Sequence, residues 1–331
     1  MNIIEALYYC GFIYKKYVGL KKQKKLPHPV ISIGNITTGG TGKTPIVIAL
    51  VRKAVERGFK PCILSRGYKG SSKLPRHASI GKGAVSDFSD LGDEPVLMAQ
   101  KTREAEIIVG VDRYKAGLLS KDSNLFILDD GFQHWRLYRD IDIVLIDVLA
   151  INVDRLLPIG SLREPQNALH RADIIIKTRS DQGNHDSIDK MLNRLGIKCP
   201  IFNAGYKPRA LINKFGQRFS IDTFSDKSVF AFSGIGNPKS FILTLKSLGV
   251  NIAGSKIFRD HYSYTSGDIV ELIKESNLSG AQCLITTEKD LLKLPIVKGI
   301  GKQSQIYAVE LDFIIDNSFY DMVFSWVEGK R

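Results

Sequence analysis

Several features are scarce or missing in this sequence of 331 residues. No stretch approaches the roughly 18 consecutive apolar residues that a membrane-spanning helix needs. The four cysteines are scattered without a CxxC pair, which argues against both a zinc site and a disulfide framework and favours a reducing, cytosolic compartment. With 44% apolar and 24% charged residues, the composition excludes disordered and collagen-like chains. The length favours two globular domains.

Acidic residues are also few, with 34 Asp and Glu against 47 Lys and Arg, which gives a net charge of +13. A surplus of this size favours an anionic partner, which leaves phosphate, nucleic acid or an anionic membrane surface open.

Part of the charge lies in residues 1–25, where six lysines are opposed by the single acid Glu5. Ahead of most of these lysines, apolar and aromatic residues from Ile3 to Val18 recur at roughly helical spacing. The segment is not a signal peptide, because the basic residues follow the apolar part and no cleavage site is present. We expect an amphipathic, basic segment that associates with a membrane interface. The alternative is a helix docked on the core, followed by a solvated lysine loop.

A glycine-rich loop follows the short apolar run 30–33 and precedes the helix-compatible stretch 45–56. Strand, glycine-rich loop, Gly-Lys-Thr and helix together are typical of a phosphate-binding loop. Lys43 is expected to reach the β- and γ-phosphates and the Thr44 hydroxyl to ligate Mg²⁺. The loop departs from the usual pattern at its first glycine, which is Thr37 here. The predicted nucleotide-binding residues are Thr37, Thr38, Gly39, Gly40, Thr41, Gly42, Lys43 and Thr44.

A second apolar run, 125–128, ends in Asp129 and Asp130. In an open α/β sheet, ligands bind at the carboxyl ends of the strands, so these two acids are expected beside Lys43 as metal ligands.

Apolar runs alternate with helical patterns along the chain, which predicts an α/β fold with a doubly wound, mostly parallel sheet. We expect a P-loop kinase domain at 26–200, a hairpin linker at 201–222 and a smaller Rossmann-like α/β domain at 223–331. The Gly234-Ile235-Gly236 segment is too short a signal for dinucleotide binding and is interpreted as the entry to a helix.

Further segments identify a family: LSRGY at 64–68, GDEP at 92–95, DDGFQH at 129–134 and LREP at 162–165. Together with the phosphate loop, they closely resemble the tetraacyldisaccharide 4'-kinase family of Gram-negative bacteria. The resemblance runs from about Val30 to Asp173, and the motifs DHY at 260–262 and TEKD at 287–290 extend it.

The resemblance implies transfer of the γ-phosphate of ATP, with Mg²⁺, to the 4'-hydroxyl of a tetraacyldisaccharide 1-phosphate. The product is the 1,4'-bisphosphate (lipid IVA) of lipid A biosynthesis, and the expected location is the cytoplasmic face of the inner membrane. It also implies two Rossmann-like domains joined by a β hairpin. The expected partners are the lipid disaccharide and the anionic membrane surface, with no nucleic acid and no protein partner.

The resemblance also assigns roles that spacing alone does not reveal. It pairs Asp93 with His261, far apart in the sequence, as the dyad that deprotonates the sugar hydroxyl, with Lys43 as a further catalytic residue. Glu94 is implied as an additional metal ligand or site-ordering acid. Residues in or near the motifs are candidates for substrate binding: Asn35, Arg66, Arg113, Gln133, His134 and Arg163.

The main alternative function is a ParA/MinD-like ATPase switch that acts on membrane or DNA. Such switches carry a lysine just before the paired glycines, where this chain has Thr38. Simple nucleic-acid binding by the basic surface is a second alternative, although no recognition motif accompanies the charge.

Overall fold

The computed structural model describes residues 2–67, 74–85, 91–150, 154–183, 185–297 and 305–329. Tyr68 of the LSRGY motif lies outside these ranges. The chain forms two compact units. The first comprises Met1–Gly205 and Phe313–Arg331, and the second comprises Tyr206–Asp312.

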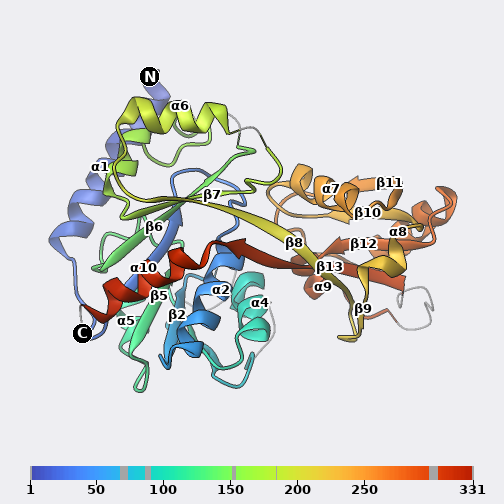
Figure 1. Cartoon of the computed structure of the whole chain (residues 1–331), viewed down its shortest axis with the longest axis horizontal. Helices are drawn as coiled ribbons and strands as arrows, with labels where there is room; N and C mark the ends of the chain where they lie inside the picture. The colour runs from blue at the N-terminus through green and yellow to red at the C-terminus, as the bar shows by residue number, and fades with distance from the viewer. Residues whose placement is uncertain are drawn as a thin grey trace. The chain divides into compact units, whose positions relative to one another are not determined.

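The first unit is built on a mostly parallel sheet in the order β7-β6-β1-β5-β2-β4-β3 (Figure 1). Among the strands that the structure describes in this unit, β3, at the edge, is the one that runs antiparallel to its neighbour, β4. The strands are β1 (Val30–Asn35), β2 (Pro61–Ser65), β3 (Arg76–Ile80), β4 (Glu106–Val109), β5 (Leu125–Asp129), β6 (Ile141–Asp147) and β7 (Ile174–Thr178). The register places Ile33 of β1 opposite Asp129 of β5, so the phosphate loop and the paired acids leave the sheet side by side.

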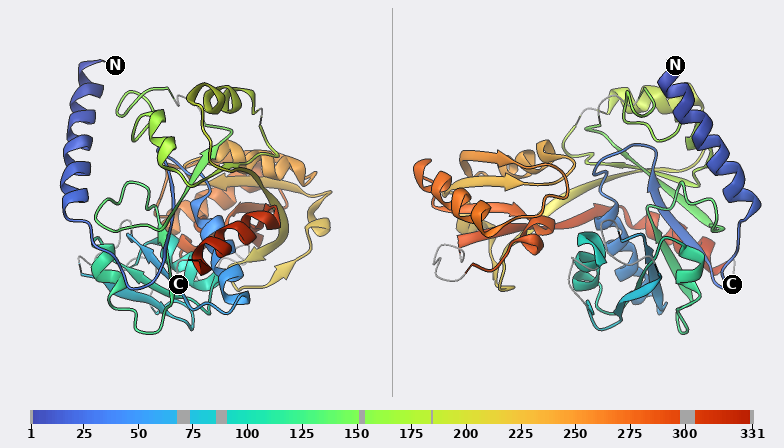
Figure 2. Two further views of the ribbon diagram at one scale, coloured as in Figure 1. Left: turned by 60° about the vertical axis from the view of Figure 1, so that its left-hand side comes forward. Right: turned by 180° about the vertical axis from the view of Figure 1, so that it is seen from behind.

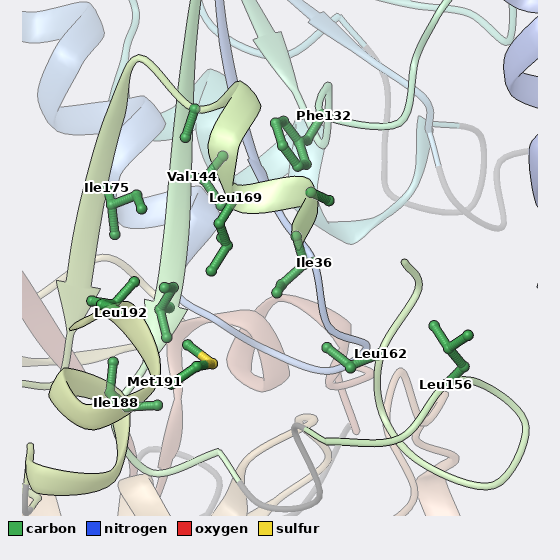
Figure 3. Packing of buried hydrophobic residues seen from close by; sticks show 13 residues of the cluster. Ile36, Phe132, Val144, Leu156, Leu162, Leu169, Ile175, Ile188, Met191 and Leu192 are labelled. Carbon is green, nitrogen blue, oxygen red and sulfur yellow. The ribbon is translucent and has the colours of Figure 1, made fainter. Parts of the chain in front are cut away.

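Helices cover the sheet of the first unit, which confirms the predicted doubly wound α/β fold. Helix α2 (Lys43–Glu56) packs against β1, β2 and β5 and contacts α4 (Asp93–Lys101). An apolar cluster joins β6 and β7 to η1 (Gln166–Arg171) and α6 (Asp186–Leu195). It includes Val144, Ile175, Leu169 and Leu192 (Figure 3). Short α5 (Arg113–Gly117) packs on β2 and β4.

The strands of the second unit run parallel in the order β11-β10-β12-β13, with helices on both faces. One apolar cluster includes Leu272 of α8 and Leu291 of α9, and the other includes Leu245 of α7. The elements are β10 (Ser228–Ser233), α7 (Pro238–Ser247), β11 (Asn251–Ile257), α8 (Ser266–Leu278), β12 (Cys283–Thr287), α9 (Glu288–Lys293) and β13 (Ile306–Ile315).

A hairpin occurs within the predicted linker. Strand β8 (Ile201–Asn213) pairs antiparallel with β9 (Arg218–Phe219), and η2 (Ile221–Phe224) follows. The Asn213 side chain accepts hydrogen bonds from the backbone N–H groups of Phe215 and Gln217, which shapes the turn. Both β8 and β13 run across the boundary between the units, so two strands connect them rather than the hairpin alone.

The C-terminal segment differs from the prediction, which placed all of 223–331 in the second domain. Phe313–Arg331 belongs to the first unit. The reason is the apolar face of α10 (Asn317–Glu328): Phe324 lies against Phe59 with ring centres 5.4 Å apart, and Phe319 lies against Phe202 at 5.5 Å. Helix α10 therefore lies beside α2 (Figure 1).

Two strands, β3 and β11, are absent from the sequence-based prediction. Both lie at an edge of their sheet and carry polar residues, so neither has the apolar run that marks a buried strand. At the other end of the chain, α1 (Ile3–Lys21) lies along the outside of the first unit (Figure 2). None of the helices within the described ranges is long and apolar enough to cross a membrane.

Candidate active site

The phosphate loop connects β1 to α2, and its conformation depends on glycine. Gly39 and Gly42 have φ values of 98° and 85°, in the left-handed region that residues with a Cβ rarely adopt. Gly42 is the N-cap of α2, and Lys43 is its first residue. The loop therefore leads directly into a helix N-terminus, where free N–H groups favour an anion.

Side chains beneath the loop hold it in place. The buried Asn35 amide donates a hydrogen bond of 2.8 Å to the Thr41 hydroxyl. Asn35, predicted to bind substrate, is thus placed under the loop.

Two residues at the end of β7, Thr178 and Arg179, also hold the loop, and the sequence analysis did not single them out. The Thr178 hydroxyl donates to the Thr41 carbonyl at 3.1 Å, and Arg179 donates to the Gly40 carbonyl at 2.8 Å. Arg179 is buried, ion-paired with Asp147, and has a φ of 56°. The available signal was the change from apolar to polar residues at the end of a predicted parallel strand.

Asp129 ends β5 in a crowded acidic environment. It is 4% exposed and accepts a hydrogen bond of 2.9 Å from the Ser65 hydroxyl. Burial, together with the nearby charges of Glu94 and Asp130, raises the pKa of Asp129 to about 7. Glu94 in turn accepts a hydrogen bond of 3.4 Å from the Thr44 hydroxyl. The predicted metal-binding residues are thus close to one another.

Asp130 is placed between two cations. Its carboxylate lies 3.4 Å from Lys43 Nζ and accepts bonds of 2.9 Å, through both oxygens, from Arg163. Although burial opposes it, the positive charges of Lys43 and Arg163 lower the pKa of Asp130 to about 2. Asp130 is therefore ionised at neutral pH. Its bonds with Arg163 bring the LREP motif, which contains Arg163, into contact with the DDGFQH motif, which contains Asp130.

Gln133 links the loop to a second buried ion pair. Its amide donates to the Asn35 carbonyl at 2.8 Å and to Glu164 at 2.6 Å. Glu164 is 1% exposed and pairs with Arg171, whose guanidinium lies over the rings of Phe132 and Trp135. Gln133 and Glu164 thus support the loop from below.

The remaining candidates near this edge of the sheet are basic. Arg113 is buried and donates to the Val111 carbonyl, and burial lowers its pKa to about 10 although Asp129 opposes the shift. Burial and the charge of Arg113 lower the pKa of His134 to about 3, so His134 is neutral. Arg66 is exposed just beyond β2.

The two residues of the predicted dyad belong to different units and are described separately. Asp93 begins α4, is 6% exposed and accepts a hydrogen bond from the Glu94 N–H. His261 follows β11 in the second unit, with a φ of 55°. The structure thus brings Lys43, Thr44, Glu94, Asp129, Asp130 and Arg163 together within the first unit.

The oxygen donors fit a magnesium ion that also binds phosphate. Within the described ranges, no three acidic, histidine or cysteine side chains form a cation cage by themselves. Mg²⁺ normally needs only one or two carboxylates, with phosphate oxygens and water completing its shell. Thr44, Glu94 and Asp129 supply such oxygens, and the crowding of negative charge that raises the pKa of Asp129 favours a cation there.

The doubly wound sheet, the phosphate loop ending in Lys43 and the acidic residues at the end of β5 define a P-loop phosphotransferase. A family model described as "LpxK: Tetraacyldisaccharide-1-P 4'-kinase" matches residues 3–328. The chain therefore belongs to the tetraacyldisaccharide-1-P 4'-kinase family.

Relatives from several bacteria agree with this assignment. The tetraacyldisaccharide 4'-kinase of Geobacter metallireducens is 36% identical over 301 residues, covering 89% of this chain and 86% of the relative. That of Desulfotalea psychrophila is 37% identical over 313 residues, covering 92% and 88%. A crystal structure of LpxK from Aquifex aeolicus in complex with ATP matches with a TM-score of 0.74 and 30% identity, covering 98% of this chain and 97% of that one.

Proposed function

We propose which residues of this chain carry out each part of the family's reaction. The chain is a kinase that transfers the γ-phosphoryl group of ATP to the 4'-hydroxyl of a tetraacyldisaccharide 1-phosphate, in lipid A biosynthesis. The observation that carries the proposal is the junction of the phosphate loop with Asp130 and Arg163, because it joins three of the family's motifs in one charged cluster.

Phosphoryl transfer depends mainly on positioning and on neutralising negative charge. The N-terminus of α2 and Lys43 bind the nucleotide phosphates, and the Asp130 carboxylate positions the Lys43 ammonium group through an ion pair. Thr44, Glu94 and Asp129 would hold Mg²⁺, which when bound supplies positive charge for the β- and γ-phosphates. Arg66 and Arg113 bind phosphate oxygens of the nucleotide or of the substrate.

The acceptor hydroxyl must lose a proton as the new P–O bond forms. A carboxylate paired with a histidine is suited to accept it, and we assign this role to Asp93 and His261. Asp93 lies at the N-terminus of α4, next to Glu94. Both units then contribute to catalysis.

The test is a phosphate-transfer assay with γ-labelled ATP, Mg²⁺ and tetraacyldisaccharide 1-phosphate in detergent micelles. Label should appear on the lipid with the unmodified protein and be lost with Lys43→Ala. The matched control is Lys53→Ala, which removes a lysine from the same helix, ion-paired with Glu56 away from the site. ATP hydrolysis without lipid labelling would overturn the proposal in favour of an ATPase switch.

Helix α1 is the proposed membrane contact, at the cytoplasmic face of the inner membrane. One side of the helix docks on the first unit. The Tyr8 hydroxyl donates a hydrogen bond of 2.8 Å to the Arg163 carbonyl, and Phe12 and Lys16 contact the Trp135 ring. The helix also approaches Trp135 closely at Gly19, where an added Cβ would lie 2.6 Å from Trp135 Cβ. On the rest of the helix, Ile3, Leu7 and Tyr14 are 80%, 69% and 71% exposed. Both interpretations of the segment therefore have support, since α1 is docked and also presents apolar residues for a lipid interface.

Vesicle co-sedimentation tests this assignment. Leu7→Gln combined with Tyr14→Gln should weaken binding to vesicles containing anionic phospholipid and raise the apparent KM for the tetraacylated substrate more than that for a short-chain, water-soluble analogue. The control is Leu278→Gln, which removes an even more exposed leucine from the second unit. Equal losses on both substrates would overturn the assignment.

A further inference from the structure

We infer that Asp290, the last residue of the TEKD motif, is a positioning residue that acts on His261 through the backbone of Gly234. The inference rests on the role proposed above for His261. It also gives a function to the TEKD motif and to the glycine segment 234–236, which belong to the second unit.

Asp290 is a fully buried carboxylate with defined partners. One oxygen, Oδ2, accepts hydrogen bonds from the Gly234 N–H at 3.0 Å and from the Thr287 hydroxyl at 2.7 Å. The buried Lys293 balances its charge, with Nζ 2.9 Å from Oδ1. A buried ion pair of this kind is a weak source of stability compared with apolar residues, so its presence favours a specific task. That task is to present an acceptor to one backbone N–H.

Gly234 is closely surrounded, and a side chain would not fit there without a shift of its neighbours. A Cβ placed on it would lie 3.1 Å from the Tyr264 hydroxyl oxygen, 3.2 Å from the Arg259 carbonyl oxygen and 3.2 Å from Asp290 Oδ1. The neighbouring Ser233 carbonyl accepts a hydrogen bond of 2.8 Å from the Phe258 N–H. Gly234 is thus fixed by its neighbours as well as by Asp290.

The opposite side of Gly234 holds His261. The Gly234 carbonyl accepts a hydrogen bond of 3.1 Å from the His261 N–H, which also lies 3.0 Å from Asp260 Oδ1. His261 has a φ of 55°, a conformation that a residue with a side chain keeps only when its surroundings impose it. The single residue Gly234, through the N–H of one peptide group and the carbonyl of the next, therefore connects the buried carboxylate to the residue whose imidazole must be placed for proton transfer.

Two double variants separate this role from a general contribution to stability. Asp290→Asn with Lys293→Met and Asp290→Leu with Lys293→Met both remove the buried ion pair. Only the first keeps an oxygen for the Gly234 N–H. We expect the Asn variant to keep kcat within about threefold of the unmodified protein and the Leu variant to lose about 100-fold, since small displacements of a catalytic group have effects of this size. The KM for ATP should not change, because the phosphate loop belongs to the first unit.

The decisive measurement repeats both double variants in a His261→Ala background. If Asp290 acts through His261, the two should then have equal residual activity, because their effects are not additive. A difference that persists without His261, or equal kcat values for both double variants, would overturn the inference and leave the proposed function intact. Full activity of His261→Ala itself would overturn both.

Thr287→Val is a milder probe should the Leu variant not fold. It removes the hydroxyl that donates to Asp290 Oδ2 and, as the N-cap of α9, accepts from the Asp290 N–H, and it leaves the ion pair in place. We expect a fall of about tenfold in kcat, with unchanged KM for ATP, that disappears in the His261→Ala background. An unchanged kcat would count against the inference.

Discussion

The first unit holds its functional side chains by charge at the ends of parallel strands, whereas the second unit holds His261 through its backbone. In the first unit, the energetic strain is electrostatic, since Asp129 is buried beside other carboxylates. In the second unit, the strain is conformational, since His261 has a left-handed φ and is bonded through Gly234 to a buried carboxylate. A bound cation would relieve the first kind of strain but does not act on the second. The two units should therefore respond differently to pH, ligand and substitution.

Asp129→Asn should have the largest effect and should separate activity from stability. Loss of a carboxylate at the proposed metal site should lower kcat by about 100- to 1000-fold. The pKa of Asp129 is raised from 3.8 to about 7 in the folded protein, so its contribution to stability is complete below about pH 4 and is lost as the pH rises through 7. The variant should therefore be more stable than the unmodified protein, by an amount that grows by roughly 3 kcal/mol between pH 5 and pH 8.

Thermal and denaturant unfolding without nucleotide or metal, at both pH values, measure this difference. Asp142→Asn is a suitable control, because Asp142 is also a buried carboxylate but is paired with Arg139. It should destabilise the protein instead. A loss of stability in Asp129→Asn at pH 8 would show that Asp129 is not under electrostatic strain.

Arg179→Lys should have an intermediate effect, because it tests how the phosphate loop is held. Lysine keeps a positive charge beside Asp147 but cannot reproduce the fork that also reaches the Gly40 carbonyl. We expect the KM for ATP to rise about tenfold, because a change of this size corresponds to the loss of one charge-assisted hydrogen bond. The change in kcat should be smaller. Arg194→Lys, on the surface of α6, is the control. An unchanged KM for ATP would show that the loop does not depend on this contact.

The same contrast explains how much was predictable from the sequence. The phosphate loop and Asp129 were predictable because each is a local pattern at the end of an apolar strand, and parallel strands bring such ends together. Arg179 was not, because its role depends on β7 lying two strands from β1 in the sheet. The role of His261 came only from family resemblance, and the support from Asp290 depends on a backbone contact that no side-chain pattern records. The sequence did not reveal that α10 belongs to the first unit, because β13 crosses the boundary between the two units without a break.

The smallest expected effect concerns backbone strain, and it compares His261→Gly with His261→Ala. Both variants lack the imidazole and should lose activity equally. Glycine adopts the left-handed region freely and alanine does not, so His261→Gly should be more stable than His261→Ala by about 1 kcal/mol, measured by denaturant unfolding. At Ser263, which does not have a positive φ, the order should reverse and the alanine variant should be the more stable. If the alanine variants were the more stable at both positions, the second unit would store no conformational strain at His261, and its contrast with the first unit would fail.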